Sequence, residues 1–185
     1  MRWDELFADL DAQAEALQIA ERAAEIDDRA RYEAGQLTLV DRLRPAIGGR
    51  LRLRCAAGVT LAGRLERVHP EWLLLSEPTG REALVSGAAV RSISGLGPWA
   101  DAPGAQSRVD ARLGLRYALR RIARDRSTVR LQLHDGDALD GTLDRVGADF
   151  VELAEHPPGE LRRRAEVTAL VTVPISAIVA VRRDG

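Results

Sequence analysis

Arginine is the residue whose type and spacing could do chemistry in this sequence. All 27 cationic residues are arginine, and the planar guanidinium group binds phosphate through paired hydrogen bonds. One set recurs every four residues and would form a single stripe on a helix, while another alternates along a predicted strand and would share one face. The helical set is Arg108, Arg112, Arg116 and Arg120, and the strand set is Arg50, Arg52 and Arg54. Both sets are candidate nucleic-acid-binding residues.

Each arginine set also has an ordinary interpretation. The use of arginine without lysine is typical of a GC-rich genome, and outward strand positions are usually polar. The helical stripe could lie against an acidic segment of the same chain or simply be solvated. A net charge of −1 and a pI near 6.3 are low for a dedicated RNA-binding protein. The arginines therefore leave open a choice between nucleic-acid contact and internal charge pairing.

The sequence lacks the patterns that build enzyme sites. His69, His134 and His156 share no ligand spacing, and Cys55 has no second cysteine with which to hold a metal. The aspartates of 135–140 do not meet the calcium-loop pattern, and no glycine-rich phosphate loop or nucleophile elbow occurs. We expect a non-enzymatic protein with no catalytic residues, no metal site and no cofactor.

An internal repeat predicts the elements that must position the arginines. Residues 129–146 repeat residues 51–68 at a constant offset of 78. In both copies a strand of alternating apolar residues leads through a glycine turn into a second strand with a central glycine. These central glycines are Gly63 and Gly141, and we expect them to mark the bend of a small curled sheet. A repeat of this kind indicates two copies of one structural unit.

Further strands and a leading helix complete each predicted unit. The helices are expected over 37–47 and 108–126, from apolar residues at three- and four-residue steps. The second copy carries an insertion at about 156–169. The predicted strands are 51–55, 61–68, 72–75, 82–85 and 89–93 in the first copy, and 129–133, 139–143, 150–153, 171–174 and 177–182 in the second.

A helix followed by five bent strands, with V-x-L-x-x-x-D-G-x-x-L-x-G-x-L in the first two, resembles the Sm-like superfamily (Sm, LSm and Hfq proteins). Asp135, Gly136, Gly141 and segment 173–178 carry the resemblance best. The tandem arrangement is similar to uncharacterised proteins of high-GC Gram-positive bacteria. The resemblance implies a mostly β protein with helices, built from two tandem Sm-like (SH3-type) five-stranded bent barrels that bind RNA. The family's asparagine-containing RNA segments are absent at the matching positions, so RNA contact is expected from the arginine faces instead.

The N-terminal residues 2–34 predict one long acidic helix. Ten acidic residues stand against four arginines in this segment, and its first half carries an apolar seam. At about 45–50 Å the helix would be longer than a small barrel is wide. Three interpretations stay open: packing along its own barrels, self-association through a helix pair, and docking on a protein partner. The candidate partner-binding residues are Trp3, Leu6, Leu10 and Leu17.

The predicted organisation has four parts: the acidic amphipathic helix (1–35), the first barrel with its leading helix (36–96), a linker (97–107), and the second barrel with its basic helix (108–185). No apolar signal segment begins the chain, and the longest uncharged run is 15 residues, too short to cross a bilayer. We therefore expect a cytoplasmic protein with no membrane contact.

Two functions remain after these exclusions. The leading hypothesis is a regulatory nucleic-acid-binding protein that contacts RNA through its arginine faces. The alternative is a protein-interaction or assembly module that uses the N-terminal helix and the edge strands of the barrels. Salt separates the two, because phosphate contacts weaken steeply with ionic strength and an apolar seam does not.

Overall fold

The computed structural model describes residues 3–102, 113–157 and 167–183, and the chain divides into two compact units. The first unit, Met1–Thr38, consists of helix α1 (Trp3–Gln36). Every side chain described in α1 is exposed, including large apolar ones such as Leu17 and Ile26. The second unit, Leu39–Gly185, contains all the strands.

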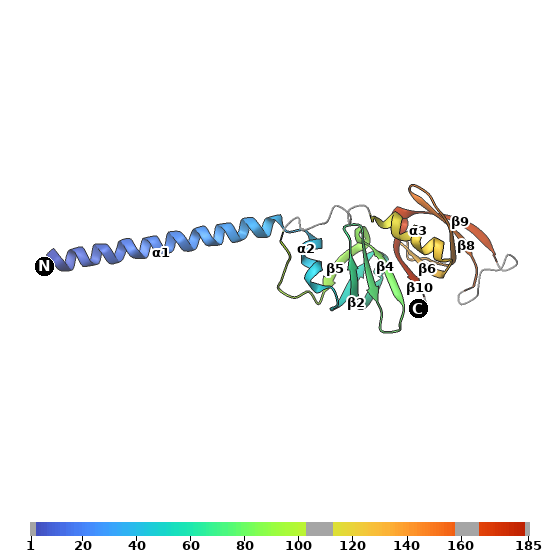
Figure 1. The fold of residues 1–185 in the computed structure, drawn as a ribbon, viewed down its shortest axis with the longest axis horizontal. Coiled ribbons are helices and arrows are strands. Elements are labelled where there is room, and N and C mark those ends of the chain that lie inside the picture. The colour runs from blue at the N-terminus through green and yellow to red at the C-terminus, as the bar shows by residue number, and fades with distance from the viewer. Residues whose placement is uncertain (1–2, 103–112, 158–166, 184–185) are drawn as a thin grey trace. The chain divides into compact units, whose positions relative to one another are not determined.

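The strands and short helices of the second unit occur in the same order in both halves (Figure 1). The first half contains α2 (Leu39–Leu43), η1 (Arg44–Ala46), β1 (Arg50–Cys55), η2 (Ala56–Gly58), β2 (Thr60–Val68), β3 (Trp72–Ser76), β4 (Glu82–Ser86), η3 (Gly87–Ala89) and β5 (Val90–Ser94). The second half contains α3 (Leu115–Asp125), β6 (Thr128–Leu133), β7 (Ala138–Val146), β8 (Phe150–Glu155), β9 (Ala169–Pro174), η5 (Ile175–Ala177) and β10 (Ile178–Arg183).

All ten strands belong to one antiparallel sheet, in the order β5-β1-β2-β3-β4-β10-β6-β7-β8-β9. The prediction of two separate five-stranded barrels, and with it the tandem Sm-like barrel fold, is therefore wrong. The two halves join where β4 pairs with β10, with Val85 opposite Ala180 and Leu84 opposite Val181. This pairing satisfies backbone groups that would otherwise be left at the edges of two separate sheets.

The repeat itself is visible in the two central glycines. A Cβ on Gly63 would overlap the carbonyl oxygen of Ser76, and a Cβ on Gly141 would overlap that of Ala154. Ser76 and Ala154 are also 78 residues apart. Both glycines are therefore required by the close approach of the next strand, as predicted for a bent sheet.

The junction strands connect two hydrophobic cores. The first core contains Val179 and Ala180, which come from the last strand of the second half. The second core contains Trp72 and Leu84, which come from the first half. Because each core is completed by strands from the other half, we expect the second unit to unfold cooperatively.

The helices that lead each half are shorter than predicted. In the first half, residues 37–47 form only α2 and η1. In the second half, α3 begins at Leu115, where the carboxylate of Glu71 accepts the backbone N–H of Leu115 at 2.7 Å. A carboxylate at this position stabilises a helix N-terminus.

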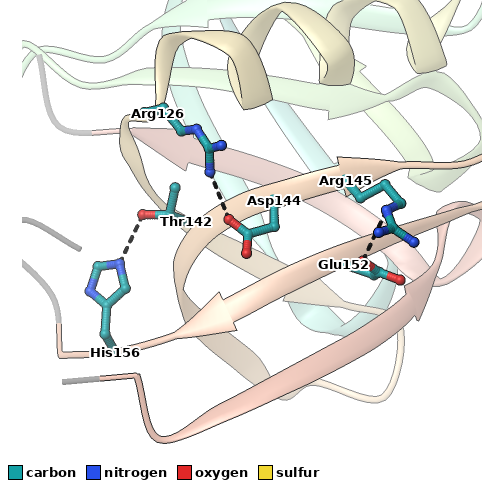
Figure 2. Close-up of polar contacts among 6 residues, drawn as sticks. All are labelled: Arg126, Thr142, Asp144, Arg145, Glu152 and His156. Carbon is teal, nitrogen blue, oxygen red and sulfur yellow. Dashed lines mark hydrogen bonds and ion pairs between the residues drawn. The ribbon is translucent and has the colours of Figure 1, made fainter. Parts of the chain in front are cut away.

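The second half also contains a buried polar pair between neighbouring strands. His156 lies 2.9 Å from the hydroxyl of Thr142 through Nε2, and its Nδ1 lies 3.0 Å from the carbonyl oxygen of Pro157 (Figure 2). Both side chains are almost fully buried. Ion pairs Arg126–Asp144 (2.8 Å) and Arg145–Glu152 (3.4 Å) lie nearby on the surface (Figure 2).

Candidate nucleic-acid interface

Strand β1 displays the predicted arginine row. Its side chains alternate strictly between exposed and buried, so Arg50, Arg52 and Arg54 share the outer face while the apolar residues enter the first core. The neighbours of Arg52 in the sheet are small, Ala62 on β2 and Ser94 on β5. Within the described part of the chain, no hydrogen bond or ion pair involves these three guanidinium groups. The row is therefore open to solvent and carries its full charge.

The equivalent face of the second half is neutralised. Arg130 occupies the position of Arg52, 78 residues later, and its Nη1 donates to Asp140 at 3.2 Å. The positions of Arg50 and Arg54 are taken by Thr128 and Gln132. Only the first half can therefore offer an open cationic strand.

Helix α3 displays the second arginine set, although only in part. Arg116 and Arg120 are exposed on α3 as predicted, whereas Arg108 and Arg112 lie outside the described residues. The opposite side of α3 packs on the sheet through Leu115 and Leu119, both buried in the second core. This burial fixes the orientation of α3 and turns its arginines outward.

Arg116 and Arg120 line a groove of about 1000 Å³ where turns of both halves meet α3. Glu71 and Asp149 also line it, but one carboxylate oxygen of Glu71 is already bonded to the start of α3. The groove is wide enough to admit an extended polymer and has two guanidinium groups on one wall.

A second groove of about 770 Å³ runs along the other side of α3. Its rim carries Arg67, Arg121 and Arg124, which make no ion pair within the described residues, and Tyr117 stands partly exposed beside them. A fourth arginine, Arg183, is held by Glu82 at 2.7 Å and by Asp125 at 2.8 Å.

Sequence reasoning missed Arg67, Arg121 and Arg124, because they fall outside the four-residue stripe and the alternating row. Their signal is visible only once the helix is placed on the sheet. Neither groove is lined by the arginines of β1, so the structure does not bring the two predicted sets into one pocket.

The candidate partner-binding residues of α1 are described only in part. The side chains of Trp3, Leu6 and Leu10 lie outside the described residues. Leu17 is 65% exposed, so it has no packing partner in its own unit. An exposed leucine on a helix is compatible with docking but does not identify a partner.

Other site chemistry was sought among the described residues. No cluster of three or more histidine, cysteine, aspartate or glutamate residues there could hold a metal ion. Cys55 is buried in the first core as predicted. Burial raises the pKa of its thiol, and the nearby charge of Arg91 opposes that shift in part. Within the same residues, no helix has the length and apolar character needed to cross a membrane.

Comparison with known proteins adds no name. No family model matches the sequence, and no curated protein matches it. The resemblance to the Sm-like superfamily therefore stays a prediction from the residues quoted above, without the tandem barrels that it implied.

Proposed function

We propose that the protein is a non-enzymatic, cytoplasmic nucleic-acid-binding protein whose ligand is single-stranded RNA. The contacts are made by the guanidinium groups of strand β1 and helix α3. The proposed contact residues are Arg50, Arg52, Arg54, Arg116, Arg120, Arg121 and Arg124.

The observation that supports this proposal is the uneven pairing of arginines in the second unit. Elsewhere in this unit arginines such as Arg126, Arg130 and Arg145 are held by carboxylates. The arginines of β1 and the outer side of α3 are exposed and make no such pair among the described residues. Unpaired guanidinium groups in rows are suited to phosphates, because binding releases counterions without first breaking an internal ion pair.

The proposal favours a single strand over a duplex. Successive arginines on the same strand face are about 6.6–6.8 Å apart, and they follow a straight row along β1. A flexible single strand can place successive phosphates along such a row. The exposed ring of Tyr117 beside Arg121 and Arg124 offers one surface on which a base can stack.

The test is fluorescence anisotropy with labelled single-stranded RNA across a salt series, with single-stranded and duplex DNA of the same sequence as further arms. We expect affinity to fall linearly with the logarithm of salt concentration, with a slope of about 0.7 per phosphate contact. Changing the three β1 arginines to glutamine should reduce that slope by about 2.

The matched control places the same charge change on α1, in Arg22, Arg29 and Arg31, all exposed. It should leave the slope unchanged. Absence of RNA binding at low salt, or equal losses in both triple variants, would contradict the proposal.

A protein-interaction role is the second candidate, and the exposure of α1 favours it. Phe7, Leu17, Ile19 and Ile26 are each at least 57% exposed, which is unusual for four large apolar side chains on one helix. A partner bound there should be held almost equally at low and high salt, in contrast to RNA.

A further inference from the structure

The two ends of the sheet carry strands of different kinds. Strand β9 ends one side and β5 ends the other, and each has one hydrogen-bonded neighbour in the described part of the chain. By their place in the repeat, β9 is the counterpart of β4 and β5 is the counterpart of β10. At the junction of the halves, β4 and β10 pair with each other. Each chain therefore makes this type of pairing once and leaves one strand of each type free.

The internal junction predicts how the free strands would pair. An offset of 88 residues relates both β4 to β9 and β5 to β10: Leu153 faces Val171 as Leu75 faces Ala83. Applied to the β4–β10 register, this offset gives three contacts between copies. They are Val173 opposite Ser92, Thr172 opposite Ile93, and Val171 opposite Ser94 of the second copy.

Charge at the two ends favours contact between unlike ends. Strands β1 and β5 together carry four arginines and no acidic residue. Strands β8 and β9 carry two glutamates and no basic residue. Opposite charges steer β9 of one copy toward β5 of another, and they disfavour pairing of β9 with β9 or of β5 with β5.

The chemistry of β9 itself fits strand addition. All six of its residues are uncharged, and Leu170 is 60% exposed. An uncharged edge with an exposed leucine lacks the charges by which proteins usually block such pairing. The one mismatch is on β5, where exposed Arg91 stands in the place of the fully buried Val179.

We propose that copies of this chain associate head to tail, through antiparallel pairing of β9 with β5 of the next copy. The contact repeats the β4–β10 junction in register and extends the sheet across molecules. Because it joins two different surfaces, copies add in one direction and close into a ring or continue as a row. This association is separate from RNA binding, since it uses backbone edges rather than the arginine faces.

The first test is the solution mass of nuclease-treated protein by light scattering over a range of concentrations. We expect masses that rise with concentration to at least twice the chain mass of 20.2 kDa. Thr172→Glu should return the mass to that of one chain, because it sets a charge at the centre of the contact. The control Thr60→Glu changes another exposed threonine, on an interior strand, and should leave association intact.

A gain of association tests the mismatch. Arg91→Val gives β5 the residue that β10 has at the junction, so the mass at a fixed concentration should rise. Adding Thr172→Glu should abolish that rise. A rise that survives this second change would mean that the valine acts by non-specific aggregation.

Cross-linking tests the register itself. Two single-cysteine proteins, Val171→Cys and Ser94→Cys, each with Cys55→Ala, should form a disulfide-linked pair only when mixed. Ala169→Cys mixed with Ser94→Cys should not, because diagonal positions are about 7–8 Å apart and disulfides do not form beyond about 7 Å. A single-chain mass at every concentration, or Val171→Cys that cross-links with itself, would overturn the proposal.

Discussion

Strand β1 and its counterpart β6 hold equivalent arginines in opposite electrostatic settings. Arg52 lies opposite Ala62 on the next strand, and Arg130 lies opposite Asp140 at the same register. The backbone of the repeat is therefore shared, and one neighbouring side chain decides whether the cation is paired. The comparison teaches that the repeat positions residues, while the residue across the strand determines whether a position can bind an anion.

The buried sides of the two halves differ much less. Leu53 and Leu131 are fully buried at equivalent positions, as are Leu65 and Leu143. The two halves thus keep their packing and differ in what they expose. Changes to the buried side should affect both halves alike, whereas changes to the outer side should affect only one.

The largest expected effect comes from the central glycines. Gly63→Ala and Gly141→Ala should each lower the free energy of unfolding by about 2–3 kcal/mol or more, because the new methyl group meets backbone atoms that cannot move aside. Urea unfolding should show one transition shifted in both variants, since the halves share their cores. Gly35→Ala is the control, because a Cβ there meets nothing. Two separate transitions would break the comparison.

A smaller effect is expected where the halves differ inside. Thr142 is fully buried, whereas its counterpart Arg64 is exposed, because His156 covers Thr142 (Figure 2). Thr142→Val leaves Nε2 of His156 without its partner, so stability should fall by about 1–3 kcal/mol. Arg64→Gln should change it by less than about 0.5 kcal/mol. Equal effects at the two positions, measured by urea unfolding, would contradict this difference.

The smallest effect concerns Cys55, whose counterpart in the second half is Leu133. Its folded-state pKa is raised, so the folded protein keeps the proton at a pH where the unfolded chain has lost it. The stabilisation is complete below about pH 9.0 and is lost as the pH rises through the folded-state pKa. Unfolding midpoints measured from pH 7 upward should fall less for Cys55→Ala than for the unchanged protein. Parallel curves would show that the thiol has no part in alkaline destabilisation.

The sequence predicted the repeat well, because its signals are local. The glycine turns, the alternation along β1 and the bend at Gly63 and Gly141 follow from neighbouring residues. The joining of β4 to β10 could not be predicted, since an edge strand looks the same whether it closes its own unit or pairs with another. Trp72 illustrates this: it aligns with Phe150 in the repeat, yet it packs in the core of the other half.

The candidate site was predicted to a similar depth. Exposure of the β1 arginines and of Arg116 and Arg120 follows from spacing alone. The grooves beside α3, and the arginines 67, 121 and 124 on their rim, depend on how the helix lies on the sheet. The pairing of Arg130 with Asp140 needed the strand register, which the sequence repeat carried but which became clear only beside Ala62.

The most direct test of the account exchanges that one neighbouring residue between the halves. Ala62→Asp places a carboxylate opposite Arg52, and Asp140→Ala frees Arg130. In RNA binding measured across a salt series, the account predicts that Ala62→Asp lowers the slope by about 0.7 and that Asp140→Ala does not lower it. An unchanged slope in Ala62→Asp would contradict the claim that the open arginine row of β1 binds RNA.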